Sequence, residues 1–108
     1  MKNQQRINEL YDAFLSLRNR EEAADFMFDL MTKAEIEELA NRWRAAKMLE
    51  ENLSYKKIEE ETGLSSRTIA RVSGYLNSGY GGYKLMINRL KNNHHHGKPS
   101  LSKKELSG

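Results

Sequence analysis

Apolar positions in the first half of the chain recur every three or four residues, the period of an α-helix. They predict a first helix over residues 3–17, a second over about residues 21–30, and a long third helix that ends near Glu51. Thr32 and Glu35 have the capping-box spacing, in which each side chain bonds the backbone amide of the other residue. Trp43, the single tryptophan, follows the apolar period of the third helix, so we expect it in the core.

The second half continues the pattern with three shorter helices. Ser54 is a good N-cap for a helix over residues 55–61, and a further helix over residues 66–77 precedes the glycine-rich stretch 79–82. The last helix is predicted over residues 83–91. No strand-like alternation of useful length occurs, so the predicted fold class is all-α, with six helices.

The residues after this last helix differ in composition. Residues 92–108 are polar and contain the only proline, three lysines and the run His94-His95-His96. We expect one helical domain over residues 1–91, followed by a disordered polar tail over residues 92–108. The histidines are expected to be solvated, and no metal site is predicted.

Composition excludes several classes of protein. The chain has 108 residues and no cysteine, so disulfides, cysteine-ligated zinc and thiol catalysis are not available to it. No apolar run approaches the roughly 20 residues of a membrane span, and the N-terminus lacks the apolar core of a signal peptide. We expect a soluble cytoplasmic protein whose short helices leave apolar faces for a partner subunit.

Charge is distributed unevenly along the chain. Residues 1–53 contain 8 Lys/Arg and 11 Asp/Glu, whereas residues 54–108 contain 10 and 4, within a total net charge of +3. Positive charge concentrated in one half is typical of a face that binds a polyanion such as nucleic acid. The alternative is a solvated helix face with no special purpose.

Residues 54–77 meet the demands of a helix-turn-helix. Gly63 supplies a residue that tolerates positive φ at the turn, and Ile58 lies five positions before it. Leu64 closes the turn, and Ile69 and Val72 follow at six and nine positions after the glycine. The pattern therefore predicts two short helices packed across a tight turn.

One position departs from the helix-turn-helix pattern. Four residues before Gly63, where a small residue usually allows the two helices to approach, the chain has Glu59. This departure predicts a more open crossing of the two helices.

The outward side of the second motif helix is small, polar and basic. Arg67 lies near its N-terminus, the end that reaches base edges when such a helix enters the major groove. Arginine can donate two hydrogen bonds to guanine, which discriminates that base by about 1–3 kcal/mol. Side chains at the start of the first motif helix could contact phosphates. The predicted DNA-binding residues are Tyr55, Lys56, Lys57, Ser65, Ser66, Arg67, Thr68 and Arg71.

Two other classes of function are weighed against DNA binding. A protein-interaction adaptor, whose basic hairpin docks an acidic partner, would show the same charge pattern. An enzyme is not expected, because the three histidines all lie near the C-terminus and the carboxylates follow solvated helix faces. The stretch Gly79-Tyr80-Gly81-Gly82 lacks the spacing of a phosphate-binding loop, so we interpret it as a hinge.

Two long runs resemble a known family. They are M-T-K-A-E-I-E-E-L-A-N-R-W-R-A-A-K-M-L-E and S-Y-K-K-I-E-E-E-T-G-L-S-S-R-T-I-A-R-V-S. Together with the glycine-rich exit they resemble the trp repressor family over about residues 5–91, in particular a branch from Gram-positive bacteria whose effector is not assigned. The resemblance implies that the protein is a transcriptional regulator. It also implies a six-helix protomer whose N-terminal helices intertwine with those of a second copy to form a homodimer. It also implies two recognition helices about one DNA turn apart on a palindromic operator.

The resemblance also implies an effector pocket, because the family binds a flat aromatic amino acid beside the motif. Thr32, Arg42 and Arg71 match the family at this pocket. Val72 and Tyr75 do not, since the tryptophan-binding members have glycine and serine there. These two side chains occupy space that the ligand ring needs, so tryptophan is not the expected corepressor.

Alternatives stay open for the effector and for two of the pocket residues. The motif is either competent for DNA without an effector or responsive to another small molecule, and no other cofactor is expected. Arg42 has a structural alternative as the ion-pair partner of Glu38, one helical turn away. Arg71 has an alternative role as a phosphate contact.

Overall fold

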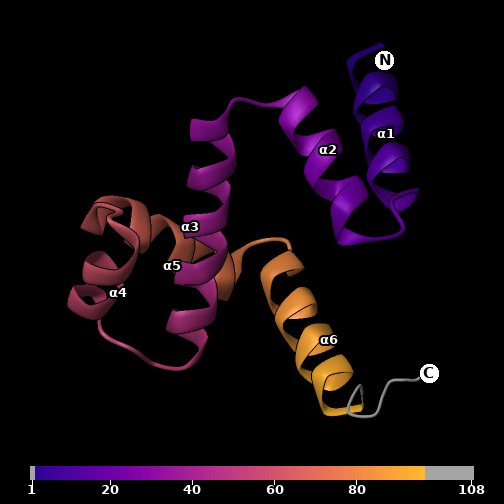
Figure 1. The fold of residues 1–108 in the computed structure, drawn as a ribbon. Helices are drawn as coiled ribbons and strands as arrows, with labels where there is room; N and C mark the ends of the chain where they lie inside the picture. Colours follow the sequence, from indigo (N-terminus) through magenta and orange to yellow (C-terminus); the bar gives the residue numbers. More distant parts are fainter. Residues whose placement is uncertain (1, 97–108) are drawn as a thin grey trace. The chain divides into compact units, whose positions relative to one another are not determined.

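A computed structural model describes the backbone of residues 2–96 and the side chains of residues 2–93. All regular structure in this part of the chain is helical (Figure 1), which confirms the predicted all-α class. The six helices are α1 (Lys2–Leu15), α2 (Arg20–Leu30), α3 (Lys33–Glu50), α4 (Tyr55–Thr62), α5 (Ser66–Ser78) and α6 (Gly82–His96). None of them has the length and apolar character needed to cross a membrane.

The predicted domain of residues 1–91 comprises two compact units that meet at Glu38 and Leu39. The first contains α1, α2 and the first turns of α3, and the second contains the remainder of α3 with α4, α5 and α6. Each unit is described by itself.

The first unit is a helical hairpin of α1 and α2. Asn19 begins α2 by accepting a hydrogen bond from the Glu22 amide, and the Glu22 carboxylate accepts one from the Arg18 amide. Phe14 and Phe26 meet edge to face, with ring centroids 5.5 Å apart. Neither α1 nor α2 contains a buried residue, so the apolar side chains of this hairpin stay at least partly exposed.

Local signals set both ends of α3. The Thr32 amide donates to the Glu35 carboxylate and the Glu35 amide donates to the Thr32 hydroxyl, which confirms the predicted capping box. At the other end, Asn52 adopts a positive φ of 64°. The Leu53 amide bonds the Met48 carbonyl and the Asn52 amide bonds that of Leu49, the pattern of a Schellman motif.

The second unit has a core built around the C-terminal half of α3. Ala45 and Ala46 are fully buried, and their small side chains let other helices approach the α3 backbone closely. The core also includes Met48, Ile58, Leu64, Ile69, Val72, Leu76 and Ile87. Trp43 is only half-buried and packs against the edge of this core, so the prediction of a core tryptophan is correct only in part.

Close backbone approach ends α5. The Gly79 amide donates to the Tyr75 carbonyl, and a Cβ atom at position 79 would lie 2.4 Å from that carbonyl oxygen. Glycine is therefore required at this exit from the helix.

The last helix is longer than the sequence pattern predicts. α6 continues to His96, so the predicted tail begins five residues too early. Residues 92–96 are polar and lack the apolar period, which is why the pattern did not include them. The remainder of the predicted tail, residues 97–108, lies outside the described residues.

Candidate nucleic-acid interface

α4 and the turn after it follow from single residues. The Ser54 hydroxyl accepts a hydrogen bond from the Lys57 amide at 3.1 Å and so caps the start of α4. Gly63 ends the helix with φ 73° and ψ 2°, and its amide donates to the Glu59 carbonyl at 2.8 Å. This left-handed conformation favours glycine, because a side chain there would clash with the backbone.

The turn also depends on a buried hydroxyl that the sequence did not indicate. The Thr62 hydroxyl donates to the Ile58 carbonyl at 2.7 Å and accepts from the Leu64 amide at 3.2 Å. Thr62 is 8% exposed, so these bonds satisfy polar groups that water cannot reach. Threonine at this position thus stabilises the turn by hydrogen bonding.

α5 begins with a second serine cap. The Ser65 hydroxyl accepts from the Thr68 amide and donates to the Thr68 hydroxyl, both at 3.1 Å. The cap and the glycine turn together set where α5 starts. Only three residues, 63–65, separate α5 from the end of α4.

The inner side of this segment matches the predicted helix-turn-helix. Ile58 and Ile69 are fully buried, Val72 is 2% exposed, and Leu64 and Leu76 are also buried. All of these except Leu76 are the apolar positions on which the predicted motif rests. Glu59, the departure from the usual small residue, is half-buried.

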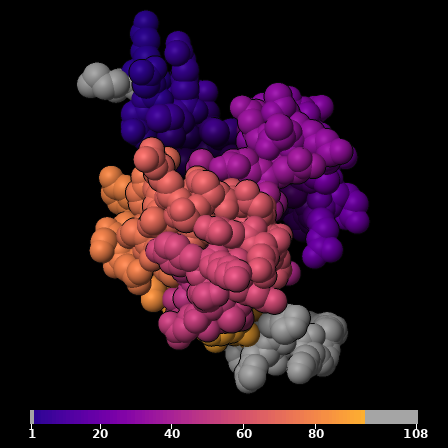
Figure 2. Space-filling view, turned by 90° about the vertical axis from the view of Figure 1, so that its left-hand side faces the viewer, coloured from indigo at the N-terminus to yellow at the C-terminus, as the bar shows by residue number. Residues whose placement is uncertain are grey.

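The outer side of α5 is exposed, as predicted, and we call it the reading face. It consists of Ser65, Ser66, Arg67, Ala70, Arg71 and Gly74. No bulky apolar side chain stands on it, and Arg67 lies in the first turn of the helix. In the space-filling view, α4 and α5 form the surface turned toward the viewer (Figure 2).

Positive charge lies at the start of α4. Tyr55 is 40% exposed, and Lys56 and Lys57 are exposed beside it. The first turns of α4 and α5 contain no acidic residue, so the partial positive charge of each helix N-terminus is not neutralised there. The acidic end of α4 is partly neutralised, because Arg44 pairs with Glu61 at 2.7 Å.

The predicted effector residues lie in different environments. Thr32 belongs to the first unit, where its hydroxyl is part of the α3 cap, so its position relative to the other four is not described. In the second unit, Arg42 is half-buried and Arg71 is exposed. Val72 is a core residue, whereas Tyr75 is 55% exposed.

Tyr75 lines an apolar groove of about 430 Å³ beside α5. Trp43 and Tyr83 form part of its wall as a stacked pair with ring centroids 6.3 Å apart. Tyr80, Gly82 and Met86 complete it, so neither Arg42 nor Arg71 lines this groove.

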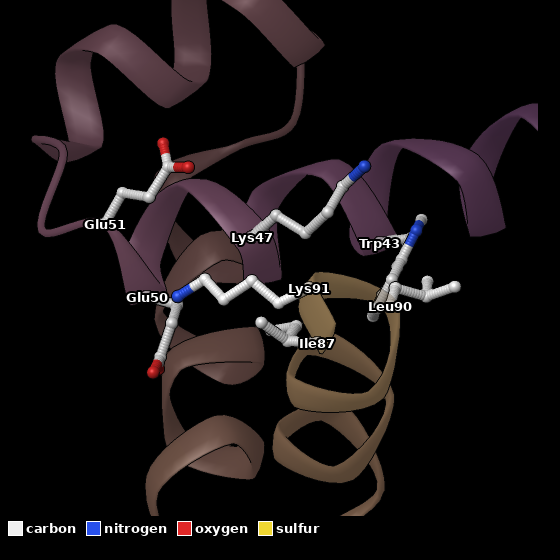
Figure 3. A pocket seen from close by; sticks show the side chains of 7 residues that line it. All are labelled: Trp43, Lys47, Glu50, Glu51, Ile87, Leu90 and Lys91. Atoms are coloured by element: carbon white, nitrogen blue, oxygen red, sulfur yellow. The ribbon is translucent and has the colours of Figure 1, made fainter. Parts of the chain in front are cut away.

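A second groove of about 370 Å³ lies between α3 and α6 (Figure 3). Trp43, Ile87 and Leu90 are its apolar residues, and Lys47 lies 5.4 Å from the centre of the Trp43 ring. Lys91, Glu50 and Glu51 complete the lining. The Glu50 carboxylate turns away from Trp43 and accepts a hydrogen bond from Lys84 at 3.0 Å.

The family model of the Trp repressor protein matches residues 5–91. The chain belongs to the Trp repressor family. This is a family of DNA-binding regulators, and the match covers α2 to α5 completely, including the helix-turn-helix.

Members of the Trp repressor family from Gram-positive bacteria are similar to this chain, as the sequence resemblance predicts. The uncharacterized protein YerC of Bacillus subtilis is 44% identical over 85 residues, which cover 79% of this chain and 82% of YerC. A TrpR-like protein from Eubacterium eligens has 44% identity and a TM-score of 0.79, covering 81% of this chain and 90% of that one. A candidate Trp repressor from Staphylococcus aureus has 40% identity and a TM-score of 0.77, covering 81% and 87%.

Proposed function

We propose that this protein is a sequence-specific transcriptional regulator of the repressor type, which binds a palindromic operator as a homodimer in the cytoplasm. The observation that carries the proposal is the division of α5 into two sides. Ile69, Val72 and Leu76 are buried, while the reading face is exposed and contains Arg67 in the first helical turn. Folding uses one side of the helix and leaves the other for base edges.

The charged side chains divide into two roles. Arg67 and the hydroxyls of Ser65, Ser66 and Thr68 lie at the end of α5 that enters the major groove in this motif. Lys56 and Lys57, with Tyr55, start α4 and contact the phosphates, which positions the protein on any sequence. Arg71, one turn further along α5, faces phosphate as well.

Exposed apolar side chains support the homodimer. In α1, Ile7 is 41%, Tyr11 57% and Leu15 83% exposed, and in α2 Phe28 is 61% exposed. Apolar side chains gathered on a hairpin that buries nothing are typical of a surface that another subunit covers. A second copy of α1 and α2 would bury them and bring two reading faces onto one operator.

The pocket residues support a regulator that does not use tryptophan. Val72 fills part of the core where the family's tryptophan-binding members have glycine, and the phenol of Tyr75 lies against an apolar groove. These two side chains favour a protein that binds DNA without an effector, or one whose DNA binding responds to a different small molecule. Titration calorimetry with tryptophan tests this, and micromolar binding would contradict it.

Selection of binding sites from a random DNA library tests the proposed function as a whole. We expect a palindrome whose half-sites lie about one helical turn, roughly 34–36 Å, apart. Absence of DNA affinity even near 50 mM salt would overturn the proposal and favour an adaptor that docks an acidic partner.

A further inference from the structure

Two ion pairs connect α3 to the helices on either side of α5. The Arg44 Nε donates to Glu61 Oε2 at 2.7 Å and so joins α3 to the end of α4. The Lys84 Nζ donates to Glu50 Oε1 at 3.0 Å and joins α6 to α3. They connect residues 17 and 34 positions apart, so both pairs tie elements that are distant in sequence.

The two pairs leave α3 in different directions. Arg44 and Glu50 are separated by six residues, which is about 9 Å along the helix axis. At roughly 100° per residue, their side chains point about 120° apart around it. α3 therefore contacts α4 through one side and α6 through another.

Within residues 2–93, α5 makes no comparable ion pair with another helix. Among the described residues, the side-chain hydrogen bonds of α5 and its cap stay local, between Ser65 and Thr68 and between Asn77 and Ser73. Its buried residues are the apolar Ile69, Val72 and Leu76, and Tyr75 lines the apolar groove beside it. Apolar burial stabilises the helix but is non-directional, so it defines orientation less sharply than a hydrogen-bonded ion pair.

We propose that Arg44 and Glu61, together with Glu50 and Lys84, are positioning residues that orient the reading face. The turn at Gly63 connects α5 to α4, and the exit at Gly79 connects it to α6. Each of these two helices forms an ion pair with α3. Loosening either pair lets α5 rotate on its apolar contacts, and the first-turn Arg67 moves away from its base. This inference rests on the proposed function, because it concerns how well that face matches its operator.

Charge alone makes the opposite prediction for one substitution. Glu61 is a carboxylate four residues before Ser65, the first residue of the reading face, so its removal on electrostatic grounds strengthens binding to every DNA. A positioning role predicts that its removal weakens discrimination between operator and unrelated DNA. The two explanations therefore differ in the measured ratio of affinities.

Glu61→Gln is the decisive variant, and Glu60→Gln is its matched control. Glu60 lies on the same helix, is exposed, and makes no hydrogen bond or ion pair among the described residues. Fluorescence anisotropy at one salt concentration gives affinities for the selected operator and for an unrelated duplex. We expect Glu61→Gln to lower the ratio of the two affinities about two- to fivefold, the range for exposed ion pairs, and Glu60→Gln to leave it unchanged.

Exchange of the two charges tests the pair directly. The double variant Arg44→Glu with Glu61→Arg keeps the net charge and restores a pair of opposite charges, so it should regain most of the ratio that Arg44→Gln loses. The same logic applies to α6, where Lys84→Gln should lower the ratio and Lys91→Gln should not. Circular dichroism and thermal unfolding verify that each variant is folded.

Equal ratios for Glu61→Gln and Glu60→Gln would overturn the inference, as would a charge exchange that restores nothing. The wild-type protein separates this failure from that of the proposed function. If the wild type selects no operator, the proposed function fails and the inference with it. If the wild type selects one and the Glu61 variant keeps the full ratio, only the positioning role fails.

Discussion

The two pairs of consecutive short helices, α1 with α2 and α4 with α5, place their apolar side chains differently. α4 and α5 together bury Ile58, Thr62, Ile69, Val72 and Leu76, whereas α1 and α2 bury no residue. The difference is one of partners, since α4 and α5 share their core with fully buried alanines of α3, whereas in the N-terminal pair Phe14 and Phe26 meet edge to face without either ring becoming buried. The helix-turn-helix pair is therefore stabilised within one chain, whereas in the proposed homodimer a second chain covers the N-terminal pair.

The largest effect in this comparison is expected from a cavity in the core. Ile69→Ala removes a fully buried side chain and should lower the free energy of unfolding by about 2–5 kcal/mol. The same substitution at Ile7 in α1, which is 41% exposed in the single protomer, should cost less than half as much at protein concentrations where the protomer is monomeric. Chemical denaturation measures both, and equal losses would show that the N-terminal pair is packed as tightly as α5.

Removing Arg67 should separate the function of α5 from its stability. Arg67→Ala should cost about 1–3 kcal/mol of discrimination at one base position and leave the unfolding transition within about 0.5 kcal/mol of the wild type. Binding to a set of operators mutated one base pair at a time measures the first quantity. Equal loss of affinity for all DNA would mean that Arg67 contacts phosphate and reads no base.

A charge placed in the apolar surface of α1 should act on assembly. Leu15 is 83% exposed, so Leu15→Asp leaves the protomer intact but should raise the dimer dissociation constant at least about tenfold, because a buried leucine is worth roughly 1.5–3 kcal/mol. Gln5→Asp adds the same charge to an exposed polar position of α1 and serves as the control. Sedimentation equilibrium compares the two, and identical dissociation constants would contradict the proposed interface.

The smallest effect should come from the start of α4. Lys56→Ala should weaken binding to operator and unrelated DNA alike and reduce the slope of log affinity against log salt by about 1. A titration series over several salt concentrations measures that slope. A loss confined to the operator would instead give Lys56 a role in base recognition.

The features that could be predicted from the sequence are those with local causes. Ser54, Ser65, Gly63 and the Thr32–Glu35 box define helix ends within a few residues, and the spacing of apolar residues identifies the buried side of α5. These signals gave six helices and the helix-turn-helix correctly. They also placed Arg67 on the exposed side.

The features that escaped prediction depend on distant or non-periodic residues. The Arg44–Glu61 and Glu50–Lys84 pairs join helices far apart in sequence, and nothing local in an arginine or a glutamate indicates its partner. The polar end of α6 has no apolar period, so its helical backbone was missed. The double hydrogen bond of Thr62 requires the geometry of the turn itself.

The glycine that ends α5 has a consequence for how this family can change. Because no side chain fits at position 79, insertions or deletions within α5 must keep a glycine in register with the carbonyl four residues earlier. Each residue added or lost would turn the departing chain by about 100° around the helix axis and send α6 in another direction. The length of α5, 13 residues, is thus more tightly constrained than the composition of its exposed side, so under the proposed function substitutions on the reading face would change the preferred operator without changing the path of the chain.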